Sequence, residues 1–555
     1  MDGSTVGGGI DLGKRTIILI ICIFLLSLAG CSQAETFEET DAEQKIVVTK
    51  EELAISIPDE VKTLDPLKVE NSWEMQIVSN IYEGLVGYNS DSKKVEPVLA
   101  KEWTIASDGL TYTFKLRDQA IFHSGKKVTA TDVKASWERA IKYSSAASWH
   151  VFNNVVGFEQ FVKGGKDNVS GINALSDEVL EVKLISPDET FLNKLTHPAA
   201  FIVNVEYINN SPSGYGLAGT VEQPTLVDGT GPFAMVEWVA HQNITLEYFN
   251  EHPAQSKFKR VDFRLAPDVE IGYADLKRGY VDILRTDTKL PSLILPKEPI
   301  IKEKFAEQTK AEILYLGFNV RKGPLQNQAL RQAISFALDR EMLGEGLNVN
   351  TETQGLLPRL LVQNRRSTTG YVFSQASARQ LIDDISEQST KQLDLSLYYV
   401  DEGDNQTLVE RIANSLNEIG IKVTPKSLNT YQELVNGVKN GVISFYLDKW
   451  TAQSEEAGFF LTPFFQSKSP YNHIGYSNEL VDELLNSIQR QKPFSKEYID
   501  SVLQLEELIM SDVPVITLFE VKDLLISSKL VNDAAFHPLL GVQPLKVRLY
   551  TEINL

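Results

Sequence analysis

Apolar and polar residues alternate with two different periods along this chain, and each change of period marks a new element. Between Leu110 and Arg117 every second residue is apolar, which is typical of a half-buried strand. After turn residues at 123–126, Thr129 and Asp132 stand at the spacing of a helix capping pair. Apolar residues then recur at helical spacing, namely Val133, Trp137 and Ile141. The pattern predicts a strand, a turn and a capped helix.

Elsewhere in the first half the same periods predict short elements. They are a strand at 55–57, a turn at 64–66, a helix over 75–85, a strand at 179–185 and an apolar run at 201–205. The turn at 228–233 reads Asp-Gly-Thr-Gly-Pro-Phe. It lacks the Lys-Ser/Thr pair of a P-loop and no capped helix follows it, so a tight turn is favoured over a phosphate site.

From Ile313 onward, predicted strands alternate with predicted helices. The predicted strands are 313–319, 393–400, 421–423, 442–447 and 515–519, and the predicted helices are 330–340, 408–419, 431–439, 480–488 and 498–510. Alternation of this kind indicates an α/β fold with a mostly parallel sheet covered by helices.

The N-terminus reads as an export signal. Lys14-Arg15 precede an apolar run over 17–28, which is shorter than the roughly 20 residues of a spanning helix. Leu28-Ala29-Gly30-Cys31 then looks like a bacterial lipobox, which implies cleavage before Cys31 and attachment of lipid to it. An ordinary secreted protein with a stray cysteine is the alternative. The only other cysteine, Cys22, lies inside the signal, so we expect no disulfide.

Bulk composition excludes some classes of protein. A chain of 555 residues with 43% hydrophobic and 23% charged residues is that of a globular protein with at least two domains. Its net charge of −20 argues against binding to nucleic acid, whose phosphates require clustered Lys and Arg. The polar, acidic stretch that follows Cys31 has no apolar face and reads as a flexible tether.

Motifs for catalysis or metal binding are not found. The sequence has no H-E-x-x-H, G-x-S-x-G, Walker A or EF-hand pattern, and its seven histidines never fall at zinc-ligand spacing. We therefore expect no metal and no cofactor. An enzyme stays as an alternative, because 74 acidic residues always contain some pair that could suit a glycosidase.

One ordered set of motifs resembles a known family. Trp103, the run from Ser107 to Phe114, Leu116-Arg117, the segment 122–125 and the segment 129–133 follow one another as in the extracytoplasmic solute-binding proteins of family 5, the peptide-binding components of ABC importers. The resemblance implies an α/β, two-lobed periplasmic-binding-protein-like fold of class II type, with an extra subdomain in the first lobe. It also implies two strands at 233–239 and 243–249, a short helix, turn and strand over 273–283, and a returning strand at 546–550.

On that resemblance the chain divides into seven segments. They are the signal at 1–30, the tether at 31–45, the first lobe at 46–84 and 201–312, the extra subdomain at 85–200, the second lobe at 313–517, and a return to the first lobe at 518–555.

The resemblance also places ligand contacts at three positions. The first is Glu70 and Ser72, on a cleft strand; the second is Arg285, Thr286 and Asp287, after a buried strand. The third is the family's Trp-x-Ala-Asp-Tyr run, in which the Asp pairs with the α-ammonium of a peptide. Here that run reads Trp450-Thr451-Ala452-Gln453-Ser454, so we assign Trp450, Thr451 and Gln453 to the site.

Gln453 departs from the family pattern. An amide offers an ammonium only a neutral hydrogen bond, about half as strong as one from a carboxylate. Either Glu455 or Glu456 supplies the charge, or the ligand lacks a free α-amine, or Gln453 is a surface residue of a realigned loop.

The function that the resemblance implies is capture of peptides, or of another small solute, in a cleft between the lobes. The partners would be an ABC permease, a cytoplasmic ATPase acting through it, and the membrane through the lipid on Cys31, with the protein itself a monomer outside the cytoplasm. Two alternatives remain: a binding protein of the same fold for nickel, haem or sugar, and an extracytoplasmic sensor.

Overall fold

The computed structural model describes residues 45–47, 49–69, 71–89, 92–210, 215–218, 227–287, 305–352, 355–362, 372–387 and 393–554. The chain falls into two units. One, residues 1–47 with 552–555, contains an antiparallel pair of strands, β1 (Lys45–Val47) and β23 (Glu552–Asn554). The predicted signal, Cys31 and all of the predicted tether except Lys45 lie outside the described residues. Within them, no helix is long and apolar enough to cross a membrane.

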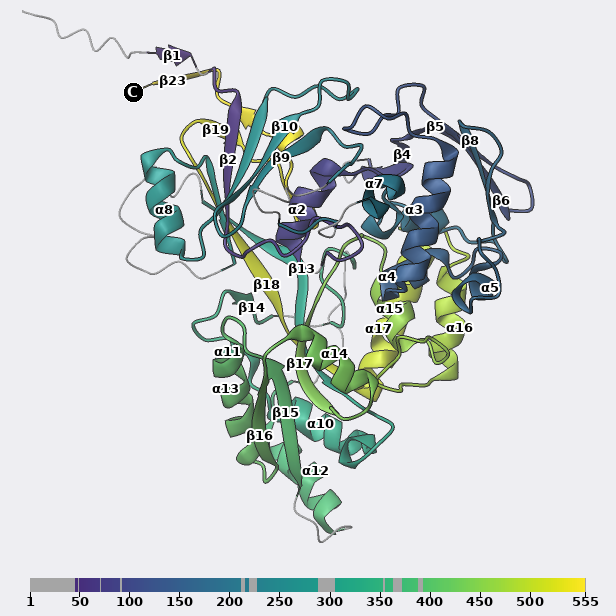
Figure 1. Cartoon of the computed structure of the whole chain (residues 1–555). Coiled ribbons are helices and arrows are strands. Elements are labelled where there is room, and N and C mark those ends of the chain that lie inside the picture. Colours follow the sequence, from purple (N-terminus) through teal and green to yellow (C-terminus); the bar gives the residue numbers. More distant parts are fainter. Residues whose placement is uncertain are drawn as a thin grey trace, which may run out of the picture. The chain divides into compact units, whose positions relative to one another are not determined.

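The other unit, residues 48–551, is organised on one large mixed sheet (Figure 1). Among the described residues its strand order is β16-β15-β17-β13-β18-β12-β2-β11-β10-β9, with β14 paired to β18. The strands are β2 (Glu52–Ile57), β9 (Phe233–Val239), β10 (Asn243–Tyr248), β11 (Arg260–Leu265), β12 (Ile283–Thr286), β13 (Phe305–Phe318), β14 (Val349–Asn350), β15 (Asp394–Val400), β16 (Lys422–Leu428), β17 (Phe445–Thr451) and β18 (Val515–Ser527).

Two long strands run through both lobes. The first residues of β13, 305–309, pair with the end of β18, while residues 312–318 pair with β17 and residues 313–317 with the start of β18. The register shifts between Thr309 and Ile313, so Lys310-Ala311-Glu312 form a bulge where the chain crosses from one lobe to the other. The fold is therefore two-lobed, as the motifs implied. Periodicity located only the second-lobe halves, 313–319 and 515–519, of these strands.

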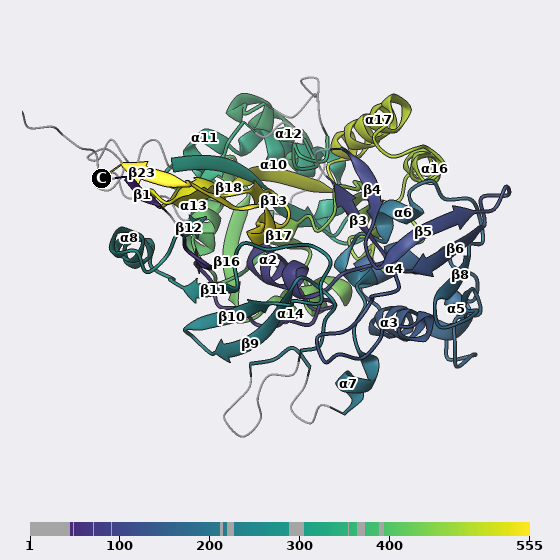
Figure 2. The ribbon, with the colours of Figure 1, turned by 90° about the horizontal axis from the view of Figure 1, so that it is seen from above.

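The first lobe packs helix α2 (Ser72–Ile81) against the sheet, with α8 (Val269–Arg278) on the other face (Figure 2). Asn71 caps α2 by accepting hydrogen bonds from the backbone N–H groups of Trp73 and Glu74. The helix ends at Ile81 and not at Leu85 as predicted, because Tyr82 is extended and the carbonyl of Ile81 accepts the Gly231 N–H at 2.8 Å.

C-terminal residues complete this lobe. β18 passes into β19 (Val531–Asp533), β20 (Phe536–His537), β21 (Gly541–Val542), the 3₁₀ turn η3 (Pro544–Lys546) and β22 (Arg548–Leu549). Apolar residues from this segment, including Leu525, Val531 and Val542, are buried in the same core as α2 and β2.

The turn at 228–233 lies against the end of α2 without room for side chains. A Cβ on Gly229 would stand 2.0 Å from the Ile81 carbonyl oxygen, and one on Gly231 would stand 2.5 Å from that of Asn80. This close backbone approach, and not phosphate binding, explains the glycines. The apolar run at 201–205 is not a strand: it leads into α7 (Val205–Asn209).

We predict that Gly229→Ala destabilises the first lobe, because either the new methyl group or the end of α2 must move. The expected loss is about 1–3 kcal/mol or more, measured as a lower urea midpoint. An unchanged midpoint would contradict the close packing of this turn.

The extra subdomain is a four-stranded antiparallel sheet with helices on one side. Its strand order is β5-β6-β8-β7, and β3 pairs with β4 beside it. The elements are β3 (Val86–Asn89), β4 (Lys94–Pro97), β5 (Ala100–Ile105), β6 (Thr111–Leu116), α3 (Ala130–Tyr143), α4 (Ala146–Phe152), α5 (Phe158–Val162), β7 (Ile172–Ala174), β8 (Val179–Lys183), α6 (Phe191–Lys194) and η1 (Pro198–Ala200). The predicted strand, turn and helix are confirmed, and Thr129 with Asp132 form a complete capping box.

Two sets of hydrogen bonds join the subdomain to the rest of the first lobe. The His123 N–H donates to the carbonyl of Gly229 at 2.8 Å, and the Ser124 hydroxyl donates to Asp228 at 2.8 Å. Arg139 of α3 reaches Asp65 with two hydrogen bonds of 2.5 and 3.1 Å. The segment 122–125 and helix α3 therefore hold the subdomain against the rest of the first lobe.

The second lobe was predicted to have a mostly parallel sheet, and this is only half right. β15 is parallel to β16 and β17, but β13 is antiparallel to both β17 and β18. Its helices are η2 (Pro324–Gln326), α10 (Gln328–Ala337), α11 (Arg340–Leu343), α12 (Gln375–Glu387), α13 (Asn405–Asn417), α14 (Tyr431–Lys439), α15 (Gly458–Phe465), α16 (Glu479–Ile488) and α17 (Lys496–Asp512). Antiparallel pairing arises because β18 turns back beside β13 to regain the first lobe.

Candidate functional site

The bulge in β13 carries two charged side chains into the junction of the lobes. Lys310 is 3% exposed and Glu312 is 5% exposed. Lys310 Nζ donates to Asp287 Oδ2 at 3.0 Å and lies 4.4 Å from the centre of the Trp73 ring. Glu312 accepts a 2.6 Å hydrogen bond from the Thr451 hydroxyl. Asp287, just after β12, and Thr451, at the end of β17, are thus joined through Lys310 and Glu312 of β13.

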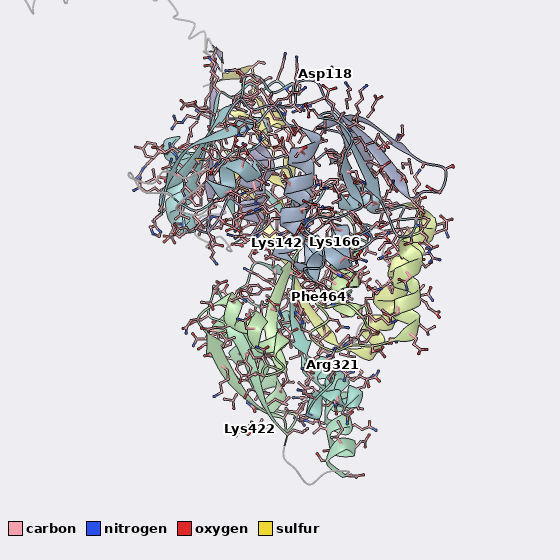
Figure 3. The ribbon with its side chains drawn as sticks, turned by 45° about the vertical axis from the view of Figure 1, so that its right-hand side comes forward. Asp118, Lys142, Lys166, Arg321, Lys422 and Phe464 are labelled. Atoms are coloured by element: carbon pink, nitrogen blue, oxygen red, sulfur yellow. The ribbon has the colours of Figure 1, made fainter. Side chains whose placement is uncertain are left out.

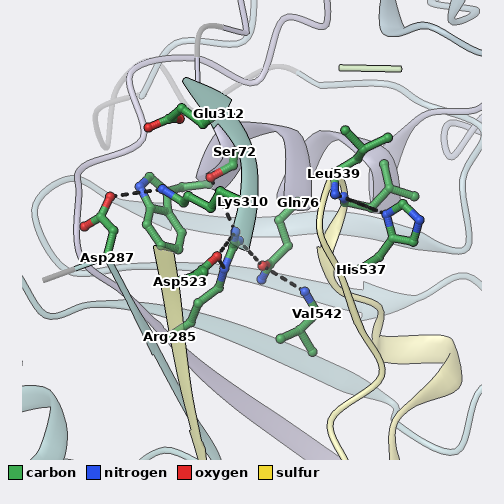
Figure 4. A network of polar contacts seen from close by, with 12 residues as sticks. Ser72, Gln76, Arg285, Asp287, Lys310, Glu312, Asp523, His537, Leu539 and Val542 are labelled. Atoms are coloured by element: carbon green, nitrogen blue, oxygen red, sulfur yellow. Dashed lines mark hydrogen bonds and ion pairs between the residues drawn. The ribbon is translucent and has the colours of Figure 1, made fainter. Parts of the chain in front are cut away.

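Arg285 lies beneath this junction, with 0% exposure. Its guanidinium donates to Asp523 Oδ2 at 2.6 and 2.8 Å, to Gln76 at 2.6 Å and to Ser72 at 3.4 Å (Figure 4). It also stacks 4.1 Å from the Trp73 ring, so Trp73 is held between two cations. Arg285 fixes the wall of the junction and offers no surface to a solute here.

Charged groups at the junction shift one another's pKa values. Burial alone would lower the pKa of Lys310, but the Asp287 and Glu312 carboxylates raise it overall. Burial would raise the pKa of Asp287, and the Lys310 charge lowers it overall. The pKa of Asp59 is raised, first by burial and then by the nearby Asp287, although the Trp73 indole N–H donates to it. The junction therefore holds Lys310 charged beside the carboxylates of Asp287 and Glu312.

Gln453 reaches across to the first lobe. Its Nε2 donates to the carbonyl oxygen of Val69 at 2.9 Å. It also hydrogen-bonds to the ring of His197 in the subdomain. His197 Nδ1 accepts the Ala199 N–H at 3.0 Å, so its Nε2 carries the proton and donates to the amide oxygen of Gln453. Both ends of the amide are thus used.

The neighbouring acids are used as well. Glu455 pairs with His537 at 3.5 Å, and Glu456 pairs with His150 at 2.8 Å. Glu456 also accepts from the Tyr498 hydroxyl at 3.0 Å and is 2% exposed. Neither carboxylate is free to face a ligand in this arrangement.

Trp450 faces away from Thr451, as successive residues of a strand must. Its ring packs 4.5 Å from that of Phe460 in α15. Asp448 shares this face, and its carboxylate accepts from the Tyr315 hydroxyl at 3.0 Å. Burial raises the pKa of Asp448 to about 6.

The structure places most of the predicted site residues around one junction. Asp287, Trp450, Thr451 and Gln453 keep part of their surface exposed. Those buried behind them are Ser72, Arg285 and Thr286. Glu70 lies outside the described residues, directly after Val69. Cys31, the predicted lipid site, also lies outside them.

Sequence reasoning missed four residues of the junction: Asp59, Trp73, Lys310 and Glu312. Lys310 and Glu312 carried a signal, since two charged residues flank Ala311 in an apolar strand. In the part of the chain that the structure describes, no three His, Cys, Asp or Glu side chains form a metal site.

Known proteins match this architecture over nearly its whole length. The model of "Bacterial extracellular solute-binding proteins, family 5 Middle" matches residues 94–472. The dipeptide-binding protein DppE of Bacillus subtilis (strain 168) is 25% identical, over 92% of this chain and 94% of its own length. Heme-binding protein A of Haemophilus influenzae is 24% identical, over 85% and 88%.

Among solved structures, the murein tripeptide binding protein MppA of Escherichia coli superposes with a TM-score of 0.72 at 20% identity, over 92% of this chain and 99% of its own. At that identity the likeness establishes the fold. Because the family model covers more than half of the sequence, and the two-lobed fold agrees with it, the chain belongs to the bacterial extracellular solute-binding proteins of family 5.

Proposed function

We propose that this protein captures peptides between its two lobes and delivers them to the permease of an ABC importer, which a cytoplasmic ATPase drives. Membership of the family and the peptide-binding names of relatives such as DppE support peptides as the solute. The observation that carries the proposal is the contact between Gln453 of the second lobe and the backbone carbonyl of Val69 in the first.

The contact between Gln453 and Val69 has the same chemistry as a hydrogen bond between two peptide groups. The Gln453 side chain is a carboxamide, and its N–H group reaches the Val69 carbonyl at 2.9 Å as the N–H of a peptide bond would. An extended peptide lying at this edge would present the same donor to the same acceptor, and would leave its side chains unread. Broad specificity follows from recognition of the backbone.

Residues around the junction divide by exposure. We assign Asp287, Trp450, Thr451 and Gln453 to direct contact with the solute, together with Glu70. The buried residues Ser72, Arg285 and Thr286 act behind them, as supports for Trp73 and Lys310.

Attachment and delivery complete the proposal. Lipid on Cys31 would tether the monomer to the outer face of the membrane, and closure of the lobes would be the signal that the permease reads. The second candidate is a non-peptide solute such as haem, nickel or sugar, or a sensing role, and the specific observation in its favour is the relative named for heme.

We predict that peptide binding changes tryptophan fluorescence, because Trp450 is part-exposed at the junction and packs on Phe460. Titration of a broad peptide panel should give saturable shifts. Trp450→Phe should remove most of the signal, while calorimetry still detects saturable binding of the same peptides. No change with any peptide would count against peptide ligands.

A further inference from the structure

Phe459 belongs to the second lobe by sequence but is buried in the core of the subdomain. It is the second residue of α15, and it is 6% exposed. Its neighbours Phe460, Leu461 and Phe465 enter the core of the second lobe, whereas Phe459 joins the core that includes Trp137 and Phe152. Helix α15 accordingly packs against α4 of the subdomain (Figure 1). The two parts interlock through one aromatic side chain.

Two histidines of the subdomain enclose that side chain. The His197 ring stacks on Phe459 with centroids 4.4 Å apart and planes 15° apart. The His150 ring meets it edge-on at 4.7 Å, while His150 Nε2 bonds to Glu456 at 2.8 Å. Every group in this contact belongs to the protein.

We propose that His150, His197, Glu456 and Phe459 form a closure latch, which holds the subdomain against the second lobe without ligand and which acid releases. This goes beyond solute capture, because it concerns the equilibrium between closed and open lobes in the empty protein. Opening must withdraw Phe459 and Gln453 from His197, and so expose one face of its ring to water.

Proton binding distinguishes the two states. In the latch, burial lowers the pKa of His197 to about 3, with His150 as a second cause and the Gln453 hydrogen bond opposing. The other charged or titratable groups here surround His150: they are Glu456, Lys194, Asp188 and Tyr498. None of them is an acid in contact with His197. A proton therefore binds His197 more tightly when the lobes are open, and falling pH favours opening.

The size of the effect follows from linkage. A fully hydrated histidine has a pKa of about 6 to 6.5, so lowering the pH from 7.5 to 5 should raise the ratio of open to closed protein by up to about 10- to 30-fold. His150 is also buried and its pKa is lowered, first by burial and then by Lys194, while Glu456 opposes the shift. Its protonation acts in the same direction.

The test is a distance measurement on ligand-free protein, which makes it independent of the identity of the solute. Cysteines replace Lys166 of the subdomain and Lys422 of the second lobe, both exposed (Figure 3), in the full chain with Cys22 and Cys31 changed to Ser. Spin labels on these sites report the separation by electron double resonance. We expect one short distance at pH 7.5 and a growing longer distance at pH 5.

Variants test which residues cause the response to pH. His197→Asn retains an acceptor for the Ala199 N–H but cannot titrate, so the change in distance between pH 7.5 and pH 5 should shrink to the part that His150 causes. Phe459→Ala should be open already at pH 7.5, with circular dichroism verifying that it is folded. The matched control is His537→Gln, which removes the other interlobe histidine contact, with Glu455, and should keep the pH response. Equal distances at both pH values, or a response of undiminished size in His197→Asn, would overturn the latch.

Discussion

Arg285→Met is expected to lower the free energy of unfolding by about 3–5 kcal/mol, the largest effect of any single change considered. Arg285 is fully buried, and its guanidinium is the partner of Asp523 at 2.6 Å. Asp523 is also fully buried, and its pKa is raised, by burial first, with the Arg285 charge opposing. Without Arg285 the carboxylate must be protonated or lose its main partner, and Gln76 and Ser72 lose the hydrogen bonds that Arg285 donates.

Urea denaturation would measure this loss, and a second variant separates its causes. Arg285→Met with Asp523→Leu removes both charges together and should recover much of the stability, since an apolar pair of similar volume can replace a buried ion pair. Lys496→Met is the control for a surface pair: Lys496 lies 2.8 Å from Asp500 and is 84% exposed, so its loss should cost under about 1 kcal/mol. Equal losses from Arg285→Met and Lys496→Met would contradict the role of Arg285 as a support of the junction.

Gln453→Asp is expected to change which peptides bind. The carboxylate would form an ion pair with a free α-ammonium, where the amide offers only an uncharged acceptor. The same change removes the donor to the Val69 carbonyl, so lobe closure weakens for every ligand. The informative quantity is therefore a ratio, the affinity for a peptide with a free N-terminus over that for its N-acetylated form. We expect this ratio to rise about tenfold.

Calorimetry on both peptides, with both proteins, gives the ratio. Gln453→Glu is the matched control, because it adds the same charge on a side chain one methylene longer and should raise the ratio less. A ratio unchanged by Gln453→Asp would remove position 453 from recognition of the N-terminus. The position would then serve the contact with Val69 and His197 alone.

Sequence patterns predicted helices and strands well where the signal lay within one short stretch of sequence. Helix Tyr431–Lys439 and strand Phe233–Val239 have the predicted bounds. The first of these followed from periodicity, and the second from family resemblance. Helix α15 was missed because it is apolar on all sides and contains Pro463, so it has neither an amphipathic stripe nor a clean helix signal. Both faces of α15 are covered because it lies between two cores, which no local window can reveal.

The junction was predictable in part. Family resemblance indicated Asp287, Thr451 and Gln453, but the partners that hold them lie far away in the sequence: Lys310, Glu312 and Val69. Glu455 and Glu456 read as free charges in the sequence. In the fold they meet His537 and His150, which stand 82 residues later and 306 residues earlier. Pairings of this kind depend on how two lobes meet, and that is a property of the fold and not of a segment.

The central claim is that peptides occupy the junction between the lobes. Native mass spectrometry of the full chain, expressed in a peptide-rich medium and purified without denaturation, tests it most directly. We expect added mass that denaturation releases as short peptides of mixed sequence. We also expect Thr451→Val with Asp287→Asn to reduce the occupied fraction while the protein stays folded. Retention of haem, a metal ion or a sugar in place of peptides would contradict it.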